Sequence, residues 1–238
     1  MAADGAALAT YDLVGADAFD WEDMAVGPGP DGNKHYLYLA DIGDNASIRP
    51  SVTVYRAEEP KFGALDSSLA IDGYEAMLFT YPDGAHDAET LLVDPVNGDL
   101  YVVTKDIGGG PAGVYRAATI GTVPGVLEKV AEIDFGALTP TKVVPPDSGA
   151  LPLALGKIPT GGDISPNGDM IAIRTYGTIW LWQRPEGGTV ADAFASPPCE
   201  APSAVETQGE AIAFTADGRG YVTASEGANS PLHRFEVE

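Results

Sequence analysis

Short apolar runs recur along this 238-residue chain, each bounded by glycine, proline, asparagine or aspartate. Such runs predict β-strands, and some alternate between apolar and polar positions, as around Val52 and Val54. No segment keeps the i, i+3, i+4 apolar spacing of an amphipathic helix for three turns. The pattern predicts an all-β fold with strands near residues 9–14, 22–27, 35–41, 52–56, 74–81, 88–93, 99–105, 113–117, 127–135, 161–165, 169–175, 178–183, 190–195, 210–215, 220–225 and 232–237.

The apolar runs belong to a repeated unit. The stretches Asp20-Trp21-Glu22, Asp87-Ala88-Glu89 and Gln208-Gly209-Glu210 each lead into an apolar strand, a turn and a second strand. A weaker fourth copy begins at Thr160, with its turn at Pro166-Asn167-Gly168. Self-similarity of this kind indicates a repeat architecture.

Four repeated units describe a β-propeller with four blades of four antiparallel strands, in a single domain over residues 1–238. The blades are expected near residues 20–82, 87–135, 158–195 and 208–238. The last unit has only three strands, so we expect strand 9–14 to join it and close the ring, leaving no long unpaired edge. Because the spacing of the units is uneven, five blades remain the alternative, with a degenerate blade around 136–160. A β-sandwich is the rival fold, but it would not explain why an acidic residue recurs at the same place in the repeated units.

Composition narrows the possible partners. The formal net charge of −22, from 35 Asp and Glu against 13 Lys and Arg, repels nucleic acid and anionic membranes and attracts cations. Solubility or adaptation to high salt could account for most of these carboxylates, but not for their recurrence at one place in each unit. No apolar run is long enough for a membrane helix, and Met1-Ala2-Ala3-Asp4 does not begin a signal peptide. The lone Cys199 excludes an internal disulfide and a cysteine metal site.

Seven segments carry a resemblance to a known family: DWEDMA, YLADIGDN, VTVYRAEEP, YPDGAHDAETLLVDP, LYVVTKD, GGDISPNGDMIAIRTYG and QGEAIAF…SEG…PLHRF. Together they resemble a bacterial family of WD40-like propeller proteins, many of them secreted. The resemblance covers residues 10–236. It implies a propeller fold and an extracellular or cell-envelope location, with a cytoplasmic one as the alternative, but no established activity. Many relatives look as if they carry about one more blade upstream, so a four-bladed variant and a trimmed chain both stay open.

The repeated glutamates are the first candidates for chemistry. In a propeller the innermost strand of each blade lines the central channel, so Glu22, Glu89 and Glu210 should converge at one mouth. In the third blade the same register falls on Thr160, with Asp163 three residues later, and Gly161 and Gly162 could allow a bulge that turns Asp163 inward. Several carboxylates around one axis need a cation or bound protons.

A hard cation with oxygen ligands suits such a ring, so the sequence predicts a Ca²⁺ site, with Mg²⁺ as the lesser alternative. Zinc does not fit, because usable cysteines are lacking and His35, His86 and His233 are scattered. The expected metal ligands are Glu22, Glu89, Asp163 and Glu210. Weaker candidates, most of them in loops after the second strands, are Asp23, Asp41, Asp44, Asn45, Asp87, Asp106 and Glu226.

Several of these residues and their neighbours have a structural alternative. The segment Asp41–Asn45 could form an Asx-type turn instead of ligating a metal. Asp20, Asp87 and Gln208 could satisfy backbone donors of neighbouring loops, which is the favoured interpretation. Lys105 and Arg174 lie near the ends of second strands, where they could form a pocket rim or balance the charges of Glu89 and Asp163. Balancing is favoured.

Two functions survive. The first is a metal-binding scaffold, expected to be monomeric, that binds a small molecule, glycan or protein at the channel mouth. The alternative is a metal-dependent hydrolase of small esters, lactones or phosphoesters at the same place, in which Glu22, Glu89 or His86 would handle protons. No Ser/His/Asp order supports serine-hydrolase chemistry. Trp180-Leu181-Trp182 is expected in the core, whereas Trp21 and Tyr176 could line a groove.

Overall fold

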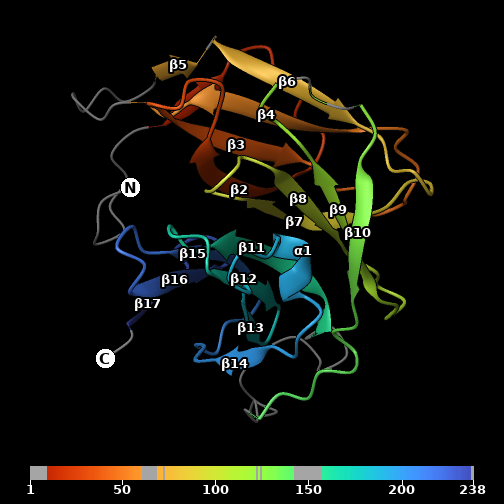
Figure 1. Ribbon diagram of the computed structural model, residues 1–238, viewed down its shortest axis with the longest axis vertical. Helices are drawn as coiled ribbons and strands as arrows, with labels where there is room; N and C mark the ends of the chain where they lie inside the picture. The colour runs from red at the N-terminus through yellow and green to blue at the C-terminus, as the bar shows by residue number, and fades with distance from the viewer. Residues whose placement is uncertain are drawn as a thin grey trace.

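The computed structural model describes residues 10–60, 69–71, 73–121, 123, 125–141 and 157–236. Four small antiparallel sheets are arranged around a centre as a four-bladed propeller (Figure 1). The innermost strands of the four blades, β2, β7, β11 and β15, contact one another in that order. The described residues contain no helix long and apolar enough to cross a membrane.

Each of the first three blades has four strands, and the fourth has three. Blade 1 contains β2 (Trp21–Pro28), β3 (His35–Asp41), β4 (Val52–Glu58) and β6 (Tyr74–Phe79), and blade 2 contains β7 (Ala88–Val93), β8 (Leu100–Thr104), β9 (Ala112–Ala117) and β10 (Glu128–Ile133). Blade 3 contains β11 (Pro159–Ile164), β12 (Met170–Thr175), β13 (Ile179–Gln183) and β14 (Cys199–Ala201), and blade 4 contains β15 (Gly209–Phe214), β16 (Gly220–Ser225) and β17 (Leu232–Glu236). The predicted all-β fold with four blades is confirmed.

The predicted closure by the N-terminal strand is wrong. The strand β1 (Tyr11–Leu13) pairs in parallel with β5 (Leu69–Ile71), beside blade 1. Blade 1 also holds the chain that follows β1, because Tyr74 donates a hydrogen bond to the Val14 carbonyl at 3.1 Å and Tyr55 donates one to the Asp17 carbonyl at 2.9 Å. These local bonds favour blade 1 over the C-terminal blade.

The strand predicted at 190–195 is also wrong. Residues Val190–Ala193 form the short helix α1, and the fourth strand of blade 3 is β14. Thr189 starts the helix as a capping box, in which the Thr189 hydroxyl accepts from the Asp192 N–H and the Asp192 carboxylate accepts from the Thr189 N–H. The alternative of a fifth blade at 136–160 falls largely on residues outside those described.

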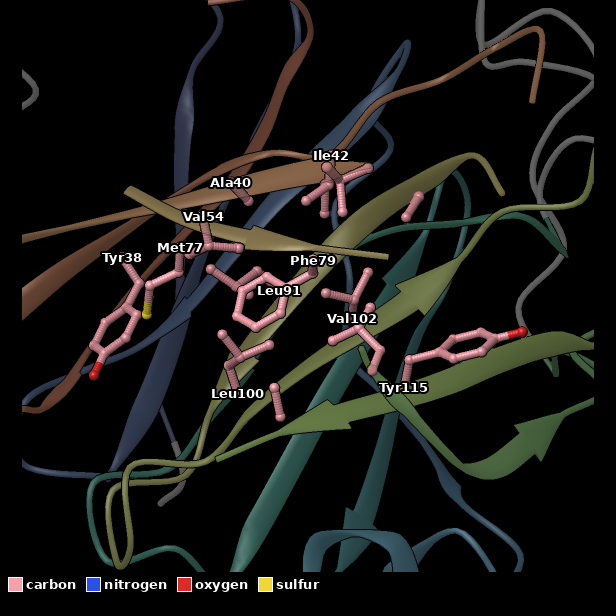
Figure 2. Packing of buried hydrophobic residues seen from close by; sticks show 14 of the residues in the cluster. Tyr38, Ala40, Ile42, Val54, Met77, Phe79, Leu91, Leu100, Val102 and Tyr115 are labelled. Atoms are coloured by element: carbon pink, nitrogen blue, oxygen red, sulfur yellow. The ribbon is translucent and has the colours of Figure 1, made fainter. Parts of the chain in front are cut away.

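Apolar sheet faces pack between blades 1 and 2 to form the first part of the core. Blade 1 contributes residues such as Tyr38, Val54 and Phe79, and blade 2 contributes Leu91 and Val102, all of them fully buried (Figure 2). The innermost strands approach so closely that a Cβ added to Gly27 would lie 2.3 Å from a methyl carbon of Val93. This contact requires glycine in β2.

Two further clusters join the next pairs of blades. Blades 2 and 3 share a cluster that includes Leu92, Ile173 and both Trp180 and Trp182, which confirms the expected core role of the two tryptophans. Blades 3 and 4 share a smaller cluster around Ile212 and Tyr221. In the part of the chain that the structure describes, no core cluster joins blade 4 to blade 1.

The faces left over on blades 1 and 4 are exposed. Met24 and Val26 on β2 are 54% and 47% exposed, whereas Leu91 and Val93, at the same places in β7, are 0% and 3% exposed. On the fourth blade, Ala211 and Ala213 of β15 are exposed as well. We call the space between these two faces the seam.

The stability of matched variants tests this asymmetry. Leu91 and Met24 each lie two residues after the repeated glutamate, but only Leu91 is buried. Leu91→Ala should lower the free energy of unfolding by about 2–5 kcal/mol, while Met24→Ala should change it by no more than about 0.5 kcal/mol. Urea unfolding of both variants measures the difference. A large loss in Met24→Ala would show that blades 1 and 4 pack together in solution.

Candidate functional site at the acidic mouth

A β-bulge occurs at the same place in each innermost strand. The pairing of each with its second strand skips one residue, and the four skipped residues are Glu22, Glu89, Thr160 and Glu210. The repeated sequence therefore encodes a repeated bulge, in the register that the sequence indicated. A bulge re-aims a side chain relative to a regular strand.

The bulges bring Glu22, Glu89 and Glu210 within electrostatic range of one another at one mouth of the propeller. Glu89 lies between the other two, because its charge acts on Glu22 and the charge of Glu210 acts on it. One cation, Lys105, enters this group and binds the Glu89 carboxylate directly. The other oxygen of Glu89, Oε2, is buried and lacks a hydrogen-bond partner among the described residues.

Burial, with a smaller effect of neighbouring carboxylates, raises the pKa values of these three side chains. Burial, followed by the charges of Glu89 and Asp20, raises the pKa of Glu22 to about 8. Burial also raises the pKa of Glu89 to about 7, although Lys105 opposes the shift. The pKa of Glu210 is raised as well, mainly by burial. Near neutral pH the mouth therefore exchanges protons.

Lys105 is held as an internal counter-ion. Burial lowers the pKa of Lys105, but the hydrogen bond and charge of Glu89 outweigh this effect and the net pKa is raised. Asp87 lies 4.0 Å from the Lys105 ammonium. Tyr176 is a further neighbour, and its pKa is raised by burial and then by the charge of Glu89. Lys105 thus makes the balancing contact with Glu89 that the sequence favoured.

Asp163 lies apart from the three glutamates. Its carboxylate accepts hydrogen bonds from the backbone N–H groups of Phe214 and Ile164, at 2.7 and 2.8 Å. Burial raises the pKa of Asp163 to about 6. The bulge that could have turned Asp163 toward the glutamates occurs instead at Thr160, whose hydroxyl donates to the Gly209 carbonyl.

Asp23 forms a second acidic level together with Asp163. Its Oδ2 atom accepts from the Leu91 N–H of blade 2 at 2.9 Å and from the Gly162 N–H of blade 3 at 3.2 Å. Burial raises the pKa of Asp23 well above its ordinary value, although these backbone bonds lower it, and the charge of Asp163 raises it further. Both aspartates therefore tie innermost strands of different blades together.

The loop after β3 is stabilised by its own acids. Asp41 forms an ion pair with Arg49 at 3.0 Å, and Asp44 accepts from the Arg49 N–H at 2.6 Å. Asp87 accepts from the Asp44 N–H at 2.7 Å, so it satisfies a backbone donor of the neighbouring loop. A Cβ added to Gly43 would lie 2.3 Å from Glu22 Oε1, so a larger residue here would displace the Glu22 side chain.

The other weak candidates also have local partners. Asp106 accepts from the N–H groups of Gly108 and Gly110, as in an Asx-type turn. The Asn45 amide lies 3.4 Å from an Asp20 oxygen. The Gln208 amide donates to both Glu210 and Glu226.

Arg174 is buried rather than placed on a rim. It pairs with Glu206 at 2.7 Å, and both side chains are 3% exposed. Its guanidinium also donates to the Ala211 carbonyl at 2.9 Å, which links β12 to blade 4. Burial lowers the pKa of Arg174. This pairing with Glu206 replaces the balance with Asp163 that the sequence suggested.

A cavity of about 430 Å³ opens beside the ring, at the inner end of the seam. Its lining comes from β2 and β3 of blade 1, from β15 and β16 of blade 4, and from Glu226 after β16. Four acids line the cavity, Glu22, Asp23, Glu210 and Glu226, while Trp21, Met24 and Leu39 supply apolar surface. Lys105 and Arg174, expected as pocket rim, are not among the lining residues.

His86 lies outside this group. It contacts Asp83 at 2.9 Å and the Tyr115 hydroxyl at 3.0 Å, and its ring packs edge-on against Tyr81. Among the residues that the structure describes, no three His, Cys, Asp or Glu side chains are gathered closely enough to hold a metal ion.

Sequence reasoning missed the partners that hold these side chains. Arg49, Glu206 and the enclosed position of Lys105 carry no local signal, because each depends on which loops meet at the mouth. Trp21 was foreseen only as a possible groove residue, and it does line the cavity. The repeated motif was the one available signal, and it identified the three glutamates.

No protein-family model matches the chain, and no curated protein matches it in sequence. Solved structures with a similar arrangement include Kuenenia stuttgartiensis hydrazine synthase, at 12% identity and a TM-score of 0.45 over 94% of this chain and 49% of that chain. Pseudomonas aeruginosa periplasmic gluconolactonase, PpgL, has 13% identity and a TM-score of 0.43 over 89% of this chain and 55% of that chain. The chain thus spans about half the length of both. Similarities this distant carry no argument about function.

The pH dependence of stability tests the environment of Glu22. The pKa of Glu22 rises from about 4.5 to about 8 on folding. Its contribution to the free energy of unfolding is therefore full below pH 4.5 and is lost as the pH rises through 8. Wild-type stability should fall across this window by up to about 1.4 kcal/mol per pH unit more than that of Glu22→Gln. Urea unfolding from pH 5 to 9 measures both slopes. A variant slope equal to the wild-type slope would contradict the raised pKa.

Proposed function

We propose that this propeller is a binding module whose acidic mouth takes up a positively charged group of a ligand. The observation that carries the proposal is the position of Glu22 and Glu210, which belong to the crowded carboxylates and also line the cavity. Asp23 and Glu226 bring the number of acids in the lining to four. A cation entering the cavity would favour the ionised form of these groups and so oppose the rise in their pKa values, which burial causes first and neighbouring carboxylates second.

The cavity also favours a ligand with an apolar part. Trp21 is 41% exposed and Met24 is 54% exposed, and both line it. Its volume lies at the lower end of the range for small-molecule sites, about 300–1,000 Å³. An amine or guanidinium next to an aliphatic or aromatic group would match these walls, with Trp21 available for a cation–π contact.

Ca²⁺ is the alternative ligand for the acidic mouth. The net charge of −22 and the three glutamates favour it. Ca²⁺ requires six to eight oxygen ligands, whereas the described residues gather no metal-holding cluster. An organic cation needs fewer simultaneous contacts, so it fits the present spacing better.

Titration calorimetry at low salt with butylguanidinium, calcium chloride and the neutral butylurea tests the proposal. Wild type should bind butylguanidinium, and Glu22→Gln and Glu210→Gln should each weaken binding about tenfold, since a hydrogen bond to a charged group contributes roughly 1.5–3 kcal/mol. Glu186→Gln is the control, because Glu186 is exposed and follows the end of β13 away from the mouth. Equal binding of butylurea, or an equal loss in Glu186→Gln, would refute a charged site. Tight Ca²⁺ binding lost in Glu22→Gln would identify a metal instead.

A metal-dependent hydrolase of small esters, lactones or phosphoesters is the second candidate. One observation favours it: Glu22, with a pKa of about 8, borders the cavity and could donate a proton near neutral pH. A substrate panel with and without Ca²⁺, run on wild type and Glu22→Gln, separates the two functions. Turnover that is lost in Glu22→Gln would establish the enzyme. No turnover on any substrate, together with butylguanidinium binding, is the result we expect.

A further inference from the structure

The seam is the place where the packing of the propeller is incomplete. At the three other contacts between blades, an apolar sheet face lies against a neighbouring sheet and is buried. At the seam, both faces are exposed: Met24 and Val26 on blade 1, and Ala211 and Ala213 on blade 4. Exposed apolar surface on two facing sheets indicates an interaction site.

The exposed surface extends beyond the small cavity. Val26 is 47% exposed and Leu232, on the outer strand β17 of blade 4, is 40% exposed, yet neither lines the cavity. A ligand that filled only the cavity would leave both uncovered. The occupant that would cover the seam is therefore larger than a small molecule.

The walls of the seam define the chemistry of the occupant. Both walls are faces of antiparallel sheets, and such faces pack against another sheet at about 10 Å. An inserted segment would have its backbone taken out of water, so its N–H and C=O groups must be paired. A β-hairpin pairs the groups between its two strands and leaves only those on its outer edges to water, whereas a single extended strand would pair none of them.

Charge decides between a foreign partner and a second copy of this chain. Glu22, Glu210 and Glu226 lie at the inner end of the seam, and the whole chain carries a net charge of −22. A second copy would bring equal negative charge into the contact and be repelled. A partner with a basic residue at the inner end would be attracted.

We infer that the seam binds a β-hairpin of a partner protein, with apolar side chains on both hairpin faces and one Lys or Arg that reaches Glu22 and Glu210. The inference rests on the proposed function, because the basic residue is the positively charged group at the mouth. The apolar faces lie against Met24 and Val26 on one side and Ala211 and Ala213 on the other.

A set of backbone-cyclised hairpins tests the inference. Each has Val, Ile or Leu on both faces and one Arg near an end, and a matched peptide carries citrulline in place of that Arg. Wild type should bind at least one Arg hairpin, and the citrulline form should bind about tenfold more weakly. A third form, with serine at the apolar positions, should not bind.

Protein variants outside the mouth separate the hairpin site from the cation site. Val26→Asp should weaken hairpin binding at least tenfold and leave butylguanidinium binding unchanged. Ile107→Asp is the matched control, since Ile107 is 60% exposed in the loop after β8, in blade 2. It should change neither.

Three results would overturn the inference: no hairpin binds at up to about 1 mM, hairpin binding survives Val26→Asp, or Ile107→Asp weakens it equally. Light scattering that showed a wild-type dimer dissociated by Val26→Asp would make a second copy the occupant, and would also overturn it. Hairpin binding that depends on Val26 but not on Arg, with no butylguanidinium binding, would refute the cation site alone and support the docking seam.

Discussion

The packing of apolar sheet faces around the centre is the interaction on which the other features depend. A small antiparallel sheet is marginal alone and becomes stable when a face is covered. Blade 2 is covered on both faces, so every residue of β7 and β8 is buried. Blades 1 and 4 are covered on one face only, and the residues of β2 and β15 alternate between buried and more exposed. The number of covered faces thus determines the burial pattern of each innermost strand.

The same packing determines where the acidic side chains lie. Innermost strands that approach closely leave little room at the centre, and the bulges direct the repeated glutamates to one mouth. Asp23 and Asp163 remain one level deeper, where backbone N–H groups of neighbouring blades satisfy them. At the upper level the charge of Glu89 adds to burial in raising the pKa of Glu22, and Lys105 opposes the shift of Glu89.

The sequence predicted the strands well because each repeat carries its own turn residues and apolar period. It did not predict which strand the N-terminal strand pairs with. Tyr11–Leu13 is recognisable as a strand, but apolar periodicity says which face is buried and not which strand lies alongside, so the pairing with β5 was missed. The helix at Val190–Ala193 was missed because one helical turn resembles a short apolar run, although Thr189 and Asp192 carried the capping signal.

The candidate site was predictable to the same extent. The repeated motif identified Glu22, Glu89 and Glu210, because equivalent residues of the innermost strands lie at equivalent positions in their blades. It could not place Asp163, which is not repeated, or the partners Glu206 and Arg49, which come from loops. The seam had no comparable signal, because Met24-Ala25-Val26 and Leu91-Leu92-Val93 are both continuous apolar runs, although only the second is buried throughout.

The seam also makes the three glutamates chemically different. Glu89 belongs to blade 2, which is covered on both sides, and its carboxylate is held by Lys105. Glu22 and Glu210 belong to the two blades that border the seam, and both line the cavity. In a ring with closed symmetry the three would be equivalent and equally enclosed. Here the repeat supplies the carboxylates, and the break in the repeat decides which two of them a ligand can reach.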